Sequence, residues 1–203
     1  MKTKKKPKED KIEFKIITIG DSNVGKTSII RRYIDNKFDE QIIQTIGINN
    51  SKKKLILKNG IEVYLNICDT MGQERFQSMN KSYVRNADVV LLVFDLSNKN
   101  TFINNKKWMD FLNDSNTGKT NALKYLIGNK KDLEKDVDDE SIKSFLEDNK
   151  DFTYKATSAK DEDDQINTLF QEMGEILYQS YKKTEKIKLK TIKLRSGENS
   201  CCS

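Results

Sequence analysis

Six short apolar runs alternate with longer amphipathic segments between residues 12 and 182. The runs have the length and composition of buried β-strands, and they cover residues 14–19, 55–57, 61–68, 89–94, 125–128 and 152–156. Residues 26–36 follow the first run with helical spacing, so the chain opens with a strand, a turn and a helix. This alternation of strands with helices predicts a mainly parallel sheet that is covered on both faces.

A hairpin signal and a C-terminal apolar stripe refine this prediction. Asn59-Gly60 lies between the second and third runs and favours a β-hairpin, because both residues tolerate positive φ. We therefore predict an α/β fold with a six-stranded, mostly parallel sheet, one antiparallel edge strand and helices on both faces. The last helix is predicted from one apolar stripe, formed by Ile166, Leu169, Phe170, Met173, Ile176, Leu177 and Tyr181.

The two ends of the chain are basic, and the body between them is slightly acidic. Residues 1–11 carry six lysines and two acidic residues, residues 182–203 carry seven basic and two acidic residues, and the rest has 24 basic and 27 acidic residues. We interpret residues 1–11 as a disordered basic arm, residues 12–182 as one domain and residues 183–203 as a flexible basic tail. The slightly acidic body argues against a nucleic-acid-binding domain.

The composition excludes several classes of site. No apolar run approaches the roughly eighteen residues of a membrane-spanning helix, and the lysine-rich start lacks the hydrophobic stretch of a secretory signal. Two of the three cysteines are the adjacent Cys201 and Cys202, which suits neither a disulfide framework nor a spaced metal site. The lack of histidine removes most zinc and general-base sites. We expect a cytosolic protein.

The segment Gly20-Asp21-Ser22-Asn23-Val24-Gly25-Lys26-Thr27 fits the phosphate-loop pattern G-x-x-x-x-G-K-[ST] between a predicted strand and a predicted helix. In that context backbone N–H groups and the helix N-terminus bind phosphate, Lys26 adds a cation for the β- and γ-phosphates, and Thr27 offers a hydroxyl to Mg²⁺. An ordinary glycine-rich turn is the alternative. The predicted nucleotide contacts here are Asp21, Ser22, Asn23, Val24, Gly25, Lys26, Thr27 and Ser28.

The tetrapeptide Asn129-Lys130-Lys131-Asp132 follows the run at 125–128 and would emerge at the same sheet edge. A carboxylate there accepts hydrogen bonds from N1–H and the exocyclic amine of guanine, a donor pair that adenine lacks, so Asp132 is the predicted specificity residue. Ser158-Ala159-Lys160 ends a further strand at that edge, where the Ala159 N–H would bind guanine O6. Taken alone, the tetrapeptide fits a solvated lysine-rich turn equally well.

The segment Asp69-Thr70-Met71-Gly72-Gln73-Glu74 ends the run at 61–68 and places a carboxylate near the predicted Mg²⁺. Gly72 would lie beside the γ-phosphate, and Gln73 would orient the attacking water. Phosphoryl transfer of this kind depends on positioning and charge stabilisation rather than on a strong base, which agrees with the lack of histidine. A strand-terminating turn is the alternative.

These segments, in this order, resemble the Ras superfamily of small GTPases and, within it, the Rab family of membrane-traffic regulators. The resemblance covers residues 12–182 and the terminal cysteines. It implies the small-GTPase fold, GDP and GTP as ligands, and GTP hydrolysis that is slow without an activating protein. By this resemblance, Thr45 joins Thr27 and Asp69 as a ligand of Mg²⁺. The resemblance also implies contacts to the guanine from Phe38, Lys130 and Lys160.

The Rab family is indicated by Arg75-Phe76, by Tyr83-Val84-Arg85 and by the ending Cys201-Cys202-Ser203. Rab proteins with such endings receive two geranylgeranyl groups, here implied on Cys201 and Cys202, and two lipid chains anchor a protein far better than one. The basic tail would add attraction to an anionic leaflet. Residues 76–87 and Lys107-Trp108 resemble the Rab subgroup that serves Golgi traffic.

The resemblance also implies partners and a place in the cell. An exchange factor, a GTPase-activating protein, effectors and a prenyl carrier would act on a monomer. That monomer would cycle between the cytoplasm and the cytosolic face of an intracellular membrane, in the Golgi or endosomal system.

Three residues depart from the Rab pattern. Cys68 stands where the family has Trp and Asn50 where it has Phe, so only Tyr83 remains of the aromatic triad that faces effectors. Met71 replaces an alanine beside the glycine and glutamine that must approach the γ-phosphate. Its longer side chain predicts slow intrinsic hydrolysis.

Two other functions remain open from the sequence alone. A nucleotide-bound interaction module with vestigial hydrolysis would also explain the altered residues. An ATP-dependent phosphate-loop enzyme, such as a small-molecule kinase, would need arginine-rich lid segments. The chain has only five arginines, and such an enzyme leaves residues 129–132 unexplained.

Overall fold

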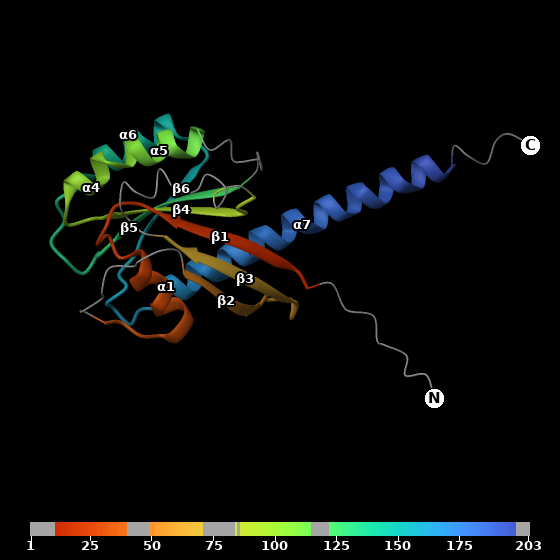
Figure 1. Ribbon diagram of the computed structural model, residues 1–203, viewed down its shortest axis with the longest axis horizontal. Coiled ribbons are helices and arrows are strands. Elements are labelled where there is room, and N and C mark those ends of the chain that lie inside the picture. The colour runs from red at the N-terminus through yellow and green to blue at the C-terminus, as the bar shows by residue number, and fades with distance from the viewer. Residues whose placement is uncertain (1–10, 40–48, 71–83, 85, 115–121, 198–203) are drawn as a thin grey trace, which may run out of the picture.

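Six strands form a single sheet in the order β2-β3-β1-β4-β5-β6 (Figure 1). The computed structural model describes residues 11–39, 49–70, 84, 86–114 and 122–197, with the backbone alone for 188–197. β2 is antiparallel to β3, and the other pairings are parallel, which confirms the predicted α/β class with one antiparallel edge strand. The strands are β1 (Glu13–Ile19), β2 (Asn49–Ile56), β3 (Glu62–Asp69), β4 (Val89–Asp95), β5 (Leu123–Asn129) and β6 (Phe152–Ala156).

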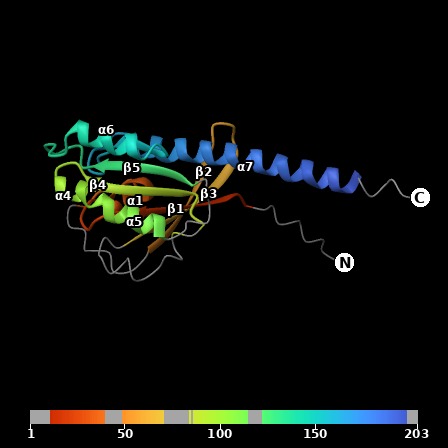
Figure 2. The same cartoon turned by 90° about the horizontal axis from the view of Figure 1, so that it is seen from above.

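Helices cover both faces of the sheet (Figures 1 and 2). α1 and α7 lie on one face and contact each other, whereas α4, α5 and α6 lie on the opposite face. Each face therefore has its own apolar core, as predicted from the alternation of strands and helices. The helices are α1 (Lys26–Asp35), α4 (Lys99–Ile103), α5 (Asn105–Asp114), α6 (Asp139–Asp148) and α7 (Gln165–Gly197).

The central strand β4 shows how one apolar run serves both cores. All seven of its residues are buried. Val89, Leu91 and Val93 belong to the core under α1 and α7, and the alternating Val90, Leu92 and Phe94 belong to the core under α5 and α6. Successive side chains of a strand point to opposite faces, so a continuous apolar run is what a doubly covered strand requires.

The edge strand β2 is longer than its apolar run. The run at 55–57 marks only the end of β2, because the strand begins at Asn49 and its first six residues are polar. Apolar-run counting misses such a strand, since exposed and half-buried residues alternate along this sheet edge. The predicted β-hairpin between β2 and β3 is confirmed.

The hairpin loop differs from the two-residue turn that Asn-Gly favours. Leu57 N–H donates to the Ile61 carbonyl (2.9 Å), and Gly60 N–H donates to the Leu57 carbonyl (2.8 Å), so three residues form the loop. Gly60 has positive φ (80°), and Asn59 instead accepts a hydrogen bond from Ile61 N–H through its side chain (3.1 Å). A β-turn followed by a left-handed glycine is the usual three-residue hairpin connection.

The C-terminal helix α7 continues to Gly197, into the segment 183–203 that the sequence predicts as a flexible basic tail. Residues 183–196 contain neither proline nor glycine, and lysine, glutamate and leucine are good helix formers. The predicted stripe is largely buried, but Ile176 and Tyr181 are exposed and Tyr178 is buried in the core instead. Figure 2 shows the helix extending well beyond the sheet.

No helix within the described part of the chain has both the length and the apolarity that crossing a membrane requires.

Candidate functional site

The predicted site segments converge at the carboxyl edge of the parallel strands. Residues 20–25 connect β1 to α1, whose first two residues are Lys26 and Thr27, Asp69 is the last residue of β3, and Asn129 is the last residue of β5. Ser158 follows β6 by two residues. Parallel strands bring their ends to the same edge, so segments up to 138 residues apart in sequence share one site.

The loop of residues 20–27 requires its two glycines. Gly20 and Gly25 have positive φ (138° and 93°). A Cβ on Gly20 would lie 2.1 Å from the Val93 carbonyl oxygen, and a Cβ on Gly25 would lie 2.2 Å from Nδ2 of Asn129. Both distances are far below van der Waals contact, so a side chain at either position would displace the loop.

Lys26 is buried at the centre of this loop. Its Nζ donates to the carbonyl oxygens of Gly20 (2.9 Å) and Asp21 (2.6 Å). Burial lowers the pKa of Lys26 to about 8, against the opposing influence of the Asp69 and Asp21 carboxylates. Two of the three N–H donors of the ammonium group therefore bind inside the loop.

Thr27 and Asp69 bring two hard oxygen groups together. The Thr27 hydroxyl, in the first turn of α1, donates to Oδ2 of Asp69 (2.7 Å) at the end of β3. Next to it, the Thr70 hydroxyl donates to the Thr18 carbonyl (2.6 Å), which ties the end of β3 to β1. A hydroxyl and a carboxylate held this close match the ligand preference of Mg²⁺, which takes oxygen ligands and keeps part of its water shell.

Asn129 connects the 20–27 loop to the segment after β6. Its Nδ2 donates to the Val24 carbonyl (2.8 Å), and its Oδ1 accepts a hydrogen bond from the Thr157 hydroxyl (3.3 Å). The side chain is only 1% exposed. A buried amide that is satisfied on both sides fixes the relative position of three chain segments.

Ser158 organises the outer part of the site. Its hydroxyl donates to Oδ1 of Asp132 (2.7 Å) and accepts from the N–H groups of Lys160 (3.2 Å) and Asp161 (3.0 Å). Ser158 is fully buried and Ala159 nearly so, whereas Asp132 is exposed. The Asp132 carboxylate is thus held at the surface by a rigid hydrogen-bonded turn.

Lys130 has a left-handed backbone (φ 63°) and an ion pair with Asp95. The Lys130 Nζ lies 2.6 Å from Oδ2 of Asp95, which is the last residue of β4. Asp95 also accepts a hydrogen bond from the Ser97 hydroxyl (2.7 Å). The long side chain of Lys130 is therefore directed along the sheet edge rather than into solvent.

Several residues that build this site were not predicted from the sequence. Arg32 on α1 donates through Nε to the Ala159 carbonyl and through Nη2 to the Lys160 carbonyl (3.0 Å each). Nothing in the spacing of Arg32 signals this contact, because 127 residues separate it from Ala159. Other unpredicted residues are Asp95, Thr157, Asn104 and Trp108.

The remaining residues named in the prediction divide into those that the structure describes and those that it does not. Phe38 is half-buried and packs against the core under α1 and α7. Asn50 is exposed and pairs across the hairpin with Cys68, which is buried and whose thiol pKa is raised by burial. Thr45, Met71, Gly72, Gln73, Tyr83, Cys201 and Cys202 lie outside the described residues.

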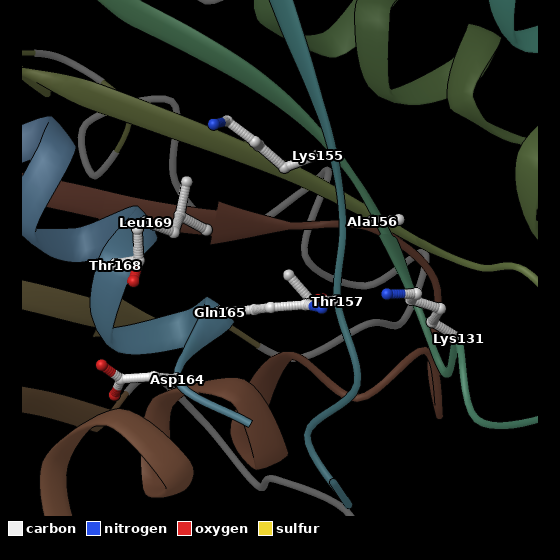
Figure 3. Close-up of a pocket in the computed structure, with 8 residues that line it drawn as sticks. All are labelled: Lys131, Lys155, Ala156, Thr157, Asp164, Gln165, Thr168 and Leu169. Atoms are coloured by element: carbon white, nitrogen blue, oxygen red, sulfur yellow. The ribbon is translucent and has the colours of Figure 1, made fainter. Parts of the chain in front are cut away.

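A pocket of about 470 Å³ lies between β6 and the start of α7 (Figure 3). Its lining includes Lys131, Thr157, Gln165 and Thr168. In Figure 3 the side chains of Lys131 and Gln165 point toward Thr157. This pocket shares Lys131 and Thr157 with the loops described above, but Lys26, Thr27 and Asp69 are not among its lining residues.

Comparison with known proteins gives consistent matches. The family model described as Ras family matches residues 15–179. Ras-related protein Rab-9A of Rattus norvegicus is 34% identical over 195 residues, which cover 93% of this chain and 96% of that protein. The Ypt/Rab-type GTPase YPT7 of Saccharomyces cerevisiae is 35% identical over 200 residues, covering 94% and 96% of the two chains. Ras-related protein SEC4 of the same organism is 35% identical over 164 residues, covering 81% and 74%.

Proposed function

Since this chain belongs to the Ras family of small GTPases, which hydrolyse GTP, we propose that it binds GDP or GTP with Mg²⁺ at the carboxyl edge of its sheet. Nucleotide exchange and hydrolysis would change its affinity for partner proteins, as in a Rab-type regulator of membrane traffic. The observation that carries the proposal is the Asn129 hydrogen bond to Val24, because it joins the phosphate-binding pattern to the guanine-binding pattern. The match to Rab-9A and YPT7 over nearly the whole chain supports the Rab-type role.

The 20–27 loop would hold the phosphates. Its backbone N–H groups and the N-terminus of α1 supply positive potential, and the third N–H donor of Lys26 would bind the β- or γ-phosphate. Thr27, Asp69 and Thr45 would hold Mg²⁺, which would neutralise negative charge on the phosphate oxygens. Gln73 would position the attacking water, with Gly72 beside the γ-phosphate. The roles of Thr45, Gly72 and Gln73 rest on the family resemblance.

Asp132 would select guanine. Ser158 donates to one of its carboxylate oxygens and thereby orients the group. The carboxylate would accept the N1–H and amine hydrogens of the base, and the Ala159 N–H would donate to O6. Lys130, Lys160 and Phe38 would border the base.

The base specificity has a direct test. Nucleotide released from the purified protein by denaturation should be GDP or GTP, and recovery of adenine nucleotide alone would overturn the assignment. Asp132→Asn would reverse one acceptor into a donor, so this variant should lose GDP affinity and gain affinity for xanthosine diphosphate, whose C2 oxygen is an acceptor. Lys131→Asn, at the exposed neighbouring position, is the control and should keep guanine preference.

The hydrolysis rate tests the Met71 hypothesis. We propose that the long Met71 side chain slows intrinsic hydrolysis by crowding the catalytic glutamine. Single-turnover GTP hydrolysis should therefore be faster in Met71→Ala than in the unchanged protein. Equal rates would remove this explanation. Turnover that stays undetectable even with a GTPase-activating protein would favour the interaction-module alternative.

Membrane attachment would come from geranylgeranyl groups on Cys201 and Cys202. We propose that these lipids, together with the basic residues before them, hold the protein on the cytosolic face of an intracellular membrane. An exchange factor, effectors and a prenyl carrier would be its partners. A tagged protein should concentrate on one organelle. The same protein with both cysteines changed to serine should stay in the cytoplasm, and unchanged membrane localisation of that variant would exclude the lipid anchor.

A further inference from the structure

Asp21, the second residue of the 20–27 loop, is bound by side chains from the opposite face of the sheet. Trp108 Nε1 on α5 donates to Oδ1 of Asp21 (2.9 Å), and Asn104 Nδ2 donates to Oδ2 (2.7 Å). The two donors are 87 and 83 residues away in sequence. Both oxygens of one loop carboxylate thus receive a hydrogen bond from the region of α4 and α5.

Both donors are held in place by contacts other than those with Asp21. Trp108 is 3% exposed and packs edge-to-face with Phe111 (6.3 Å between ring centroids) in the core under α5. Asn104 caps the C-terminus of α4, and its backbone N–H donates to the Asn100 carbonyl (3.0 Å). Hydrogen bonds to an ionised carboxylate are roughly twice as strong as neutral ones, so these two contacts constrain the loop strongly.

The backbone of Asp21 carries this constraint to Lys26. The Asp21 carbonyl accepts the shorter of the two Lys26 hydrogen bonds (2.6 Å), and the Gly20 carbonyl accepts the other (2.9 Å). The Asp21 side chain is therefore hydrogen-bonded to α5, and the carbonyl of the same residue is hydrogen-bonded to the buried ammonium group of Lys26. Movement of Asp21 would shift the carbonyl that orients this ammonium group.

We propose that Trp108 and Asn104 are positioning residues for nucleotide binding. They hold Asp21, which holds Lys26 in the geometry that retains the phosphates, and they thereby slow nucleotide release. This inference rests on the proposed function of the site. It assigns no contact between Trp108 or Asn104 and the nucleotide itself.

The rate of GDP dissociation tests the proposal. Trp108→Phe keeps an aromatic ring in the core but removes the N–H donor, and it should speed GDP release about tenfold, the effect of losing one hydrogen bond to a charged group. Asn104→Ala should also speed release, and since Asn104 is only half-buried this variant perturbs the core little. The GDP dissociation rate of Asp21→Ala should equal that of the double variant that combines Trp108→Phe with Asn104→Ala.

Combining the variants separates positioning from general destabilisation. Adding Trp108→Phe to Asp21→Ala should cause no further increase in the release rate, because the acceptor is already missing. Ile142→Ala is the control, since it truncates a buried side chain of the same core on α6 without altering Trp108, Phe111 or Asn104. It should lower thermal stability yet leave GDP release unchanged. Trp108 is also the single tryptophan, so its emission should shift in Asp21→Ala protein.

Two results would overturn the inference. One is equal GDP release from Trp108→Phe, Asn104→Ala and unchanged protein. The other is full additivity of Trp108→Phe with Asp21→Ala. If Trp108→Phe does not fold, the test uses Asn104→Ala instead. Adding Asn104→Ala to Asp21→Ala should then cause no further increase in the GDP release rate, and full additivity would overturn the inference. Failure of the unchanged protein to bind GDP would instead contradict the proposed function.

Discussion

At the scale of single residues, the buried polar side chains of the site form hydrogen bonds with residues from other segments of the chain. Asn105 on α5 is a buried polar residue that differs from them. Asn129 and Ser158 are buried and hydrogen-bonded to other segments. Asn105 on α5 is 1% exposed, and neither its Nδ2 nor its Oδ1 has a hydrogen-bond partner among the described residues. A buried amide without partners carries the full cost of losing its water.

Replacing Asn105 should therefore stabilise the protein. Asn105→Leu keeps the approximate volume and removes the desolvated amide, so the free energy of unfolding should rise by about 1–3 kcal/mol. Urea denaturation measures this change. Asn149→Leu is the control: the Asn149 amide donates to the Phe145 carbonyl (2.8 Å) at the end of α6, so this variant should lose stability. A destabilised Asn105→Leu protein would show that Asn105 has a partner in solution.

The glycines offer a second residue-scale prediction. In Gly60→Ala the added Cβ would have no atom within 4 Å, and only the positive φ is unfavourable. This variant should lower the free energy of unfolding by about 1–2 kcal/mol. Gly25→Ala has positive φ and also pushes against the Asn129 amide, so it should cost more and weaken GDP binding. Denaturation and GDP titration of both variants check this. Normal GDP affinity in Gly25→Ala would contradict the proposed cradle.

At the scale of elements, helix α6 shows how one capping residue sets the start of a helix. Asp138 is its N-cap, and its carboxylate accepts the Ser141 N–H (2.7 Å) and lies 3.3 Å from Lys99 Nζ. The hydrogen bond from Ser141, followed by smaller contributions such as that of Lys99, lowers the pKa of Asp138 to about 2. The cap therefore stabilises the helix most in its ionised form.

This shift predicts how stability depends on acid. A carboxylate whose pKa is lower in the folded state stabilises the fold fully above its ordinary pKa, and this contribution is lost as pH falls toward the folded pKa. For Asp138 the loss should occur between about pH 4 and pH 2. Asp138→Asn keeps a capping acceptor but cannot ionise, so its melting temperature should fall less than that of the unchanged protein over this pH range.

Asp138→Ala is the control for the acid prediction. It removes both the charge and the cap, so it should be less stable than Asp138→Asn even near neutral pH. An Asp138→Asn protein whose melting temperature falls as steeply as that of the unchanged protein would contradict the role assigned to this carboxylate.

At the scale of the whole molecule, α7 has two different halves. Its first half packs on the sheet, with Phe170, Met173, Leu177 and Tyr178 buried in the core under α1. Side chains 181–187 are exposed or half-buried, and the helix extends past the sheet in Figures 1 and 2. α7 starts near the site edge and runs away from it, so its far half lies away from that edge.

Two truncations test this division. Ending the chain after Lys182 should change the free energy of unfolding by less than about 0.5 kcal/mol and leave GDP release unchanged. Ending it after Ile176 also removes the buried Leu177 and Tyr178 and should cost about 2–5 kcal/mol or more. Urea denaturation of both proteins provides the comparison. Equal stability of the two truncated proteins would contradict the assigned boundary of the core.

Much of the fold was predictable from the sequence because its signals are local. A continuous apolar run such as residues 89–94 reflects burial on both faces, and the six runs predicted the six strands in order. Gly20 and Gly25 are needed for backbone angles that neighbouring residues impose, so their spacing already predicts the loop. The six polar residues that begin the edge strand β2 and the full length of α7 were not predicted, because exposed residues leave no hydrophobic pattern.

The sequence by itself determined the strand order along the chain, the class of the fold and which segments reach one sheet edge. Only the tertiary structure decided which side chains meet there. Asn129 with Val24, Arg32 with Ala159 and Trp108 with Asp21 are contacts between residues 87 to 127 positions apart. Such pairs depend on how helices pack across the sheet, and no local preference of the backbone encodes that geometry.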